Sequence, residues 1–320
     1  MTHKGSNPKK HHFIPQGILK NFTKTGYLRW FSKELQKQHK QSTGSAGFKK
    51  YFYNYPESKE SLETDFFPKI DSDAASIIDE IIKNKSIKSI NANSYKKSKL
   101  IKYIATQKLR TPRVYDDMKR FEEIIKEEIH PDISMNNNEN IRTTFLNGIK
   151  KNSKILEEIL NEKKLELHKS KKGEEYIIGD DPVLSFNRCH QRNVIIASKD
   201  YPFLIKWNIY MFPISHNLMI SFIDDDKSLI DDFLFYKENH NGFQFALSND
   251  FVYSRTEETL EKEKQNYHNA SYELIKNNSP EIIHDYNIKR GDKLIIRPFE
   301  ITLTPEVRKQ ILEAYLKTKN

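Results

Sequence analysis

Hydrophobic residues are spaced differently in the two halves of the chain. In the first half, isoleucine, leucine and alanine recur three and four positions apart, which is the spacing of the buried face of a helix. This pattern predicts helices over residues 63–84 and 94–109, with Pro68 marking either a kink or a later start of the first helix. Helices are also predicted over residues 115–129 and 141–165.

In the second half, the apolar runs are short and are separated by glycine, aspartate, proline and asparagine, as in strands joined by turns. An earlier aromatic run predicts a strand over 27–31, followed by a polar connector over 32–50. Helices are predicted over 225–235, from about 250 to 277, and from Pro305 onward. The runs that predict strands are 176–178, 183–186, 194–197, 203–211, 218–223, 243–247 and 294–297.

These elements predict an α+β fold in a single domain of 320 residues. Residues 1–165 form a mainly helical half. It packs on residues 166–320, which mix helices with mostly antiparallel strands. A chain of this length can bury a substantial core without covalent staples.

The single cysteine, Cys189, excludes an internal disulfide and the paired cysteines of a zinc site. No run of about 18 apolar residues is present, and the first twenty residues lack the apolar segment of a signal peptide. We therefore expect a cytoplasmic protein that is not a membrane protein.

The formal charge of +9 favours a nucleic acid as partner, because clustered basic residues displace counterions from phosphates. Most of the excess is lysine, and the chain is also rich in asparagine and isoleucine, a trio that an A/T-rich genome favours. The competing interpretation is therefore that these lysines only form protein surfaces in contact with water. The chain has no phosphate-binding glycine loop, no HExxH, no GxSxG and no dinucleotide fingerprint, which argues against those enzyme classes.

His11 and His12, followed by Pro15, form the least generic local pattern in the sequence. Histidine titrates near neutral pH and can act as a metal ligand, a general acid or base, or a phosphate contact. Neighbouring side chains on an extended segment point in opposite directions, so one of the two is expected to face a site. The alternative is that one lies in the core and the other in solvent.

Two further polar groups suggest chemistry. Asp180 and Asp181 follow a predicted strand and suit magnesium or a general base, although glycine, aspartate and proline together also form ordinary turns. Gln107, Arg110 and Arg113 share one face if their helix persists. Arginines there could clamp a phosphate or carboxylate, or form ordinary salt bridges.

Acidic residues also flank the start of the first long predicted helix. Glu63 and Asp71 are eight residues apart, which places them nearly on one face if Pro68 does not break the helix. With a histidine they could complete a metal site. The competing interpretation is that they only complement the helix dipole.

Taken together, these pieces resemble the uncharacterised bacterial proteins grouped as domain of unknown function family 4238, over about residues 10 to 290. By that resemblance Asp180 is the characteristic acid. Asp181 is its replaceable neighbour, because the family usually has Ser-Asp-Asn-Pro there, and Asp71 stands in place of a glutamate. The resemblance implies no reaction. The residues that carry it are His11-His12-x-x-Pro15 with Leu19 and Asn21-Phe22, Gln107-x-x-Arg110-Thr111-Pro112, Gly179-Asp180-Asp181-Pro182-Val183, and Pro213-Ile214-Ser215.

The leading hypothesis is a phosphodiester hydrolase, a bacterial nuclease of toxin or phage-defence type, with a composite site between the two halves of the chain. The first alternative is a nonenzymatic module that senses a nucleic acid or another ligand through the same cleft. A second is a buried network that only joins the two halves. The hypothesis assigns catalysis to His11, His12, Arg110 and Asp180, substrate contacts to Gln107, Arg113 and Ser215, and a divalent metal such as Mg²⁺ to Asp180 with Asp71.

Overall fold

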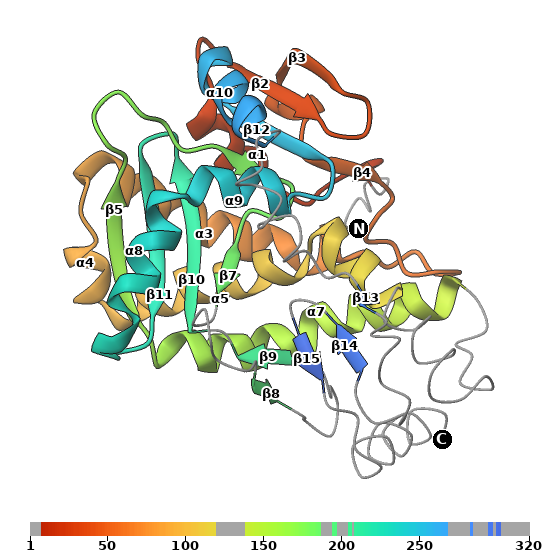
Figure 1. Cartoon of the computed structure of the whole chain (residues 1–320). Helices are drawn as coiled ribbons and strands as arrows, with labels where there is room; N and C mark the ends of the chain where they lie inside the picture. Colours follow the sequence, from red (N-terminus) through yellow and green to blue (C-terminus); the bar gives the residue numbers. More distant parts are fainter. Residues whose placement is uncertain are drawn as a thin grey trace.

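The computed structural model describes residues 8–119, 138–186, 194–196, 204–206, 208–267, 282–283, 294–296 and 299–301. Within them the longest helices lie in the first half of the chain. Most strands lie in the second half, and all the strand pairs described are antiparallel. The predicted α+β class is therefore confirmed (Figure 1).

A four-stranded antiparallel sheet lies at the centre of the fold, with strand order β5-β11-β10-β7. Every residue of β10 and β11 is buried, which explains why both strands are almost continuously apolar in sequence. β5 and β7 form the two edges of this sheet. The bounds are Lys164–Lys169 for β5, Leu184–Phe186 for β7, Ile209–Ser215 for β10 and Leu218–Ile223 for β11.

Helices cover both faces of this sheet (Figure 1). On one side, Tyr103 of α5 contacts Phe212 of β10, with 6.0 Å between ring centroids. On the other, Tyr236 of α8 stacks on Phe186 of β7 at 4.1 Å. Helices α3 and α7 both pack on α5, and α9 packs on α8. The bounds are Phe67–Asn84 for α3, Ser94–Leu109 for α5, Asn138–Asn161 for α7, Ile230–Glu238 for α8 and His240–Leu247 for α9.

A second sheet, ordered β3-β2-β12-β6, joins distant parts of the chain. Its central strand β12 pairs with β2 from the N-terminal region and with β6, which immediately precedes Asp180. Helix α10 packs on β2 and β12. The bounds are Tyr27–Ser32 for β2, Lys37–Ser42 for β3, Ile178–Gly179 for β6, Phe251–Ser254 for β12 and Glu257–Tyr267 for α10.

The histidine pair lies on a short strand, β1 (Lys10–His12), which pairs with β4 (Phe48–Lys50) and sets His12 opposite Phe48. The polar connector predicted over 32–50 is therefore wrong, because β3 and β4 lie within it. The side chains of β3 are mostly exposed, so this strand lacks the alternating apolar pattern by which strands are recognised.

Four other predictions needed correction. The helix predicted over 63–84 is two helices, α2 (Leu62–Asp65) and α3, and Pro68 lies in the first turn of α3, so it marks a true start. The strand predicted over 243–247 is helix α9. The helix predicted from 250 is preceded by β12, because pairing with two other strands outweighs the local polarity. The last predicted helix of the first half ends at Asn161, before β5.

Several short elements complete the described chain, and residues 112–119 are helical. Within the residues described, no helix is long and apolar enough to cross a membrane. Residues 120–129 of a predicted helix, Cys189 and the predicted helix from Pro305 lie outside the described residues. The short elements are α1 (Gln16–Leu19), η1 (Lys20–Phe22), η2 (Thr43–Ser45), α4 (Lys88–Asn91), β8 (Val194–Ile196) paired with β9 (Leu204–Lys206), η3 (Lys227–Leu229), and β13 (Ile282–Ile283), β14 (Leu294–Ile296) and β15 (Phe299–Ile301) in one sheet.

The helical layer over β5 contains a buried histidine that makes the fold sensitive to acid. Neither ring nitrogen of His240 has a hydrogen-bond partner in the described part of the chain, and burial lowers the pKa of His240 to about 3. Burial also lowers the pKa of His168 to about 4. A folded-state pKa below the unfolded value means that the folded protein binds fewer protons. The stability from these neutral histidines is therefore complete above the unfolded value of 6.5 and is lost as pH falls toward the folded values.

We therefore expect the midpoint of urea unfolding to decrease as pH falls from about 6.5 to about 4. His240→Phe should make this decrease smaller, whereas the same change at the exposed His39 should leave it as in the wild type. Urea titrations at four pH values measure the effect. Parallel pH dependences for wild type and His240→Phe would contradict it.

Candidate functional site

The C-terminal end of α5 presents a fully buried arginine. The Nη1 of Arg110 donates to both carboxylate oxygens of Asp71, at 2.9 and 3.0 Å, and its Nε and Nη2 donate to Gln107 Oε1 at 2.8 and 2.5 Å. The rings of Phe67 and Tyr103 flank the guanidinium at 5.0 and 5.6 Å. Burial by itself lowers the pKa of Arg110, but the charge of Asp71, together with Tyr103 and Tyr53, raises the pKa overall, so Arg110 stays charged.

His12 lies beside this ion pair. Its backbone N–H donates to Glu63 Oε1 at 3.3 Å, and its ring packs against Phe48 at 5.8 Å. Ring atom Nε2 is buried and has no hydrogen-bond partner among the described residues. Burial, and then the positive charges of Lys10 and Arg110, lower the pKa of His12 to about 4. The imidazole is therefore neutral at neutral pH and can accept a proton.

Glu63 is the second titratable group at this position. It lies in the first turn of α2, where Ser61 caps the helix by accepting a hydrogen bond from the Glu63 N–H. Burial raises the pKa of Glu63 to about 7, against the hydrogen bond from His12 N–H and the charge of Arg110, which lower it. At neutral pH the carboxyl is thus divided between its acid and its base form. We call His12, Glu63, Asp71 and Arg110 the acid–base cluster.

His11 is a structural residue in this arrangement. Its Nδ1 accepts from the backbone N–H of Tyr53 at 2.9 Å, so Nε2 carries the proton and donates to the Pro8 carbonyl at 2.8 Å. The Tyr53 hydroxyl in turn donates to the Arg110 carbonyl at 2.6 Å. Both ring nitrogens of His11 are occupied, so it positions Tyr53 and the end of α5. Of the two adjacent histidines, only His12 has a buried ring nitrogen without a hydrogen-bond partner among the described residues.

Gln107 joins the N-terminal segment to α5. Its Nε2 donates to the Phe13 carbonyl at 2.7 Å, and its Oε1 accepts from Arg110. The same side chain therefore holds the strand that carries His12 and the guanidinium of Arg110. With both polar atoms occupied, Gln107 is a positioning residue here, and the substrate contact predicted for it has no free group in the described structure.

Asp180 lies apart from the acid–base cluster. Its two carboxylate oxygens accept from the backbone N–H groups of Asn249, Asp250 and Phe251, at 2.6, 2.8 and 2.9 Å. Burial raises the pKa of Asp180, and these three hydrogen bonds oppose that shift. The carboxylate thus holds the turn before β12 and faces that turn.

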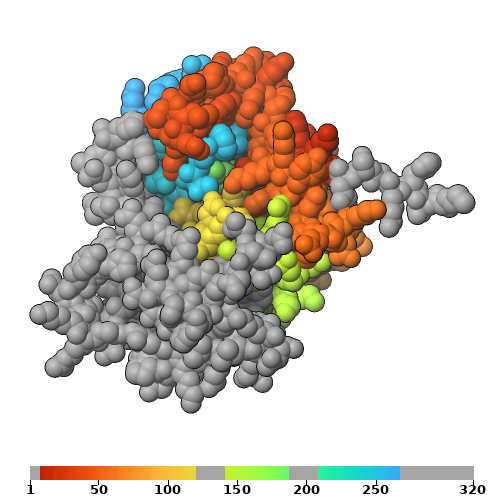
Figure 2. Space-filling model, turned by 90° about the vertical axis from the view of Figure 1, so that its right-hand side faces the viewer, coloured from red at the N-terminus to blue at the C-terminus, as the bar shows by residue number. Residues whose placement is uncertain are grey.

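Asp181 and Arg113 both lie near Asp117, in a polar group that includes no residue of the acid–base cluster. Lys108 Nζ donates to the Val183 carbonyl at 2.9 Å and lies 3.5 Å from Asp181 Oδ2, whereas Asp181 Oδ1 is buried with no partner in the residues described. Arg113 Nη1 donates to the Leu247 carbonyl, so Arg113 does not share the cluster of Arg110. Figure 2 shows the segment near residue 115, in yellow, between N-terminal residues in orange and residues near 250 in cyan.

The remaining predicted residue, Ser215, is the last residue of β10, at the turn into β11. Its hydroxyl donates to Asn217 Oδ1 at 2.8 Å and accepts from the Leu218 N–H at 3.1 Å. The preceding carbonyl, of Ile214, accepts from Asn21 Nδ2 at 3.1 Å, which ties this turn to the N-terminal segment. Ser215 shapes the turn and, among the described contacts, makes none with the acid–base cluster.

The structure thus unites three predicted site residues, His12, Asp71 and Arg110, with Glu63, which the sequence suggested, together with Asp71 and a histidine, as a possible metal ligand. The capping serine two residues before Glu63 was the one local signal that placed it at a helix start. Among the described residues, no group of three or more His, Cys, Asp or Glu side chains could hold a metal ion. Asp71 and Asp180, the two residues predicted to hold a divalent metal, contact different groups in the described structure: Asp71 accepts from Arg110, and Asp180 accepts from backbone N–H groups.

A family model described as "Protein of unknown function (DUF4238)" matches residues 10–258. The matched segment contains the whole acid–base cluster as well as Asp180. Comparison with curated proteins and with solved structures finds no match.

Proposed function

Because the chain belongs to the DUF4238 family, whose description assigns no reaction, we propose from the site itself that the protein is a hydrolase of phosphodiester bonds acting on a nucleic acid. The observation that carries this proposal is the pairing of His12, neutral and with a free Nε2, with Glu63, whose pKa is about 7. Two groups whose environments separate their pKa values in this way are suited to act as base and acid in one reaction.

In the proposed reaction His12 takes a proton from the attacking water as its oxygen bonds to phosphorus, and protonated Glu63 gives its proton to the leaving oxygen as the bond between that oxygen and phosphorus breaks. Arg110 has most of its donors occupied by Asp71 and Gln107, so its role here is to set the electrostatics around both groups. Lys10 shares the Phe48 ring with His12, with Nζ 4.7 Å from the ring centroid, and is the nearby exposed cation that would attract a phosphate.

The acid–base assignment predicts a bell-shaped dependence of activity on pH. His12 must be neutral, which holds above about 4, and Glu63 must be protonated, which holds below about 7. We therefore expect cleavage of labelled RNA or DNA to lose about tenfold in rate for each pH unit above 7. Glu63→Gln, which cannot titrate, should remove this alkaline decline along with most of the activity.

The assay uses single- and double-stranded RNA and DNA between about pH 5 and 9, with Mg²⁺, Mn²⁺ or EDTA, so that any metal requirement becomes visible. Glu34→Gln, at an exposed glutamate, is the matched control. If the cleavage rate of Glu63→Gln still declines above pH 7 as in the wild type, Glu63 is not the acid in the reaction. If none of the four substrates is degraded, the proposal is wrong.

A nonenzymatic binding module is the second candidate. The observation that favours it is that the hydrogen-bonding atoms of Arg110 and Asp180 are bonded to other groups of the chain. Both motif residues therefore support the fold. This candidate predicts salt-dependent binding of the same nucleic acids without turnover, at equal affinity in wild type and Glu63→Gln. A role in toxicity or phage defence remains a prediction from the sequence.

A further inference from the structure

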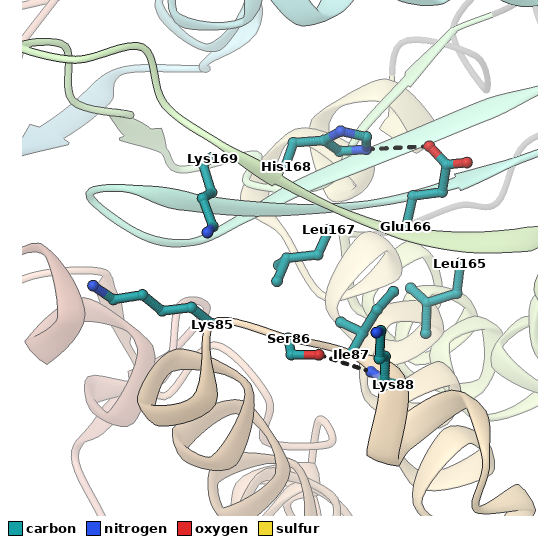
Figure 3. Close-up of a pocket in the computed structure, with 9 residues that line it drawn as sticks. All are labelled: Lys85, Ser86, Ile87, Lys88, Leu165, Glu166, Leu167, His168 and Lys169. Carbon is teal, nitrogen blue, oxygen red and sulfur yellow. Dashed lines mark hydrogen bonds and ion pairs between the residues drawn. The ribbon is translucent and has the colours of Figure 1, made fainter.

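Away from the acid–base cluster, a groove of about 430 Å³ runs along the edge strand β5 (Figure 3). The connection between α3 and α4 forms its other side. Ile87, Leu165 and Leu167 give the groove an apolar middle, and Lys85, Lys88 and Lys169 stand around it. The groove therefore offers apolar contact flanked by positive charge.

The backbone of β5 offers unpaired hydrogen-bonding groups to this groove. Along an antiparallel strand, successive residues direct their N–H and C=O groups alternately to either side. Ser170 N–H donates to the Asn217 carbonyl on the β11 side, whereas the Leu165 carbonyl accepts from Asn91 Nδ2 on the outer side. By this alternation Leu167 and Lys169 direct their backbone groups outward. β5 is an edge in the described sheet, so these groups have no strand to pair with.

The charges around this edge select the kind of strand that could pair with it. β5 reads Lys-Leu-Glu-Leu-His-Lys, and antiparallel pairing with a second copy through its outward-directed residues would set Leu167 opposite Leu167 and Lys169 opposite Leu165, which brings the lysines of both grooves to the same edge. Lys85 and Lys88 add further positive charge on the opposite side of the groove. Self-association is therefore disfavoured, and a strand that carries carboxylates is favoured.

We propose that this groove binds an extended acidic peptide segment of a partner protein, which adds as a strand to the outer edge of β5. Its main chain pairs with Leu167 and Lys169, its apolar side chains contact Leu165 and Leu167, and its carboxylates pair with the surrounding lysines. The proposal does not depend on the hydrolase activity, because the groove shares no residue with the acid–base cluster.

Fluorescence anisotropy with a labelled peptide of four Glu-Val repeats tests the proposal on the full chain. We expect saturable binding at low salt, no binding of the matching Lys-Val peptide, and loss of at least about tenfold in affinity when alternate peptide nitrogens are methylated. Methylation removes main-chain donors without changing charge. An equal affinity of methylated and unmethylated peptides would overturn strand addition, as would no saturation up to about 1 mM.

Lys85→Gly gives a variant that does not endanger the fold. Lys85 ends α3 with a φ of 49°, a left-handed conformation that glycine adopts without strain. The melting temperature of the Lys85→Gly protein should therefore equal or exceed that of the wild type. Peptide affinity should fall about threefold in Lys85→Gly and further in Lys169→Glu. Lys24→Glu, at an exposed lysine outside the groove, is the control and should bind as wild type does.

The remaining outcomes separate the proposal from its rivals. If short oligonucleotides bind at the lysines while the Glu-Val peptide does not, the groove is a polyanion site and the proposal is wrong. Affinity that stays unchanged in both Lys85→Gly and Lys169→Glu would place the peptide elsewhere and would also overturn it.

Discussion

Replacing His12 with glutamine is expected to lower the rate constant for nucleic-acid cleavage by about 10²- to 10⁴-fold. Glutamine can keep the backbone hydrogen bond from residue 12 to Glu63, and like the neutral imidazole it carries no charge at neutral pH. What it lacks is a nitrogen that can accept a proton. The loss should therefore appear in the chemical step, measured by single-turnover cleavage with enzyme in excess.

The controls for this variant separate catalysis from folding. His39→Gln changes an exposed histidine and should cleave at the wild-type rate. His11→Gln removes a ring that joins Tyr53 to Pro8, so it should lower the melting temperature as well as the activity. A His12→Gln protein with wild-type melting and wild-type cleavage would show that the free Nε2 takes no part in the reaction.

The largest expected change in stability comes from Asp71→Asn. Arg110 is fully buried, and Asp71 is its carboxylate partner at 2.9 Å, so this substitution leaves a buried charge without its counterion. Breaking such a pair from one side costs about 3–5 kcal/mol. Because the Asp71 side chain is 27% exposed and water reaches it, we expect the lower end of that range. Urea unfolding near neutral pH measures the change.

A matched control lies two residues along the same helix. Asp73 pairs with Lys99 at 2.9 Å, but both of these side chains are partly exposed, at 30% and 23%. The same substitution there, Asp73→Asn, should cost much less stability than Asp71→Asn, as is usual for ion pairs in contact with water. If the two variants lose equal stability, the buried pair does not support the fold in the way that its geometry implies.

The motif residues act mainly by holding together the end of α5. His11 reaches it through Tyr53, and Gln107 ties it to the strand that carries His12. This arrangement explains why residues widely separated along the chain form one pattern although most of their polar atoms are bonded within the fold. The structural residues keep His12 and Glu63 beside a buried charge, and that environment shifts the pKa of both groups.

Periodicity alone identified the elements whose buried face is continuous. Helix α5 and strand β11 begin and end where their apolar patterns predict, whereas the strand predicted over 203–211 overlaps β9 and only the first residues of β10. These patterns are local, so they can be read without knowing what the element packs against. The same reasoning failed for β3, which buries little, and for α9, whose short apolar run fits either a strand or a buried helix.

The sequence by itself determined the α+β class and marked His12, Asp71 and Arg110, because unusual residues in a specific order are visible without coordinates. Only the tertiary structure decided their roles. In the structure both ring nitrogens of His11 have hydrogen-bond partners, Asp180 accepts from three backbone N–H groups, and Glu63 lies beside His12. These roles depend on burial and on hydrogen bonds between segments far apart in the chain, and no local pattern encodes them.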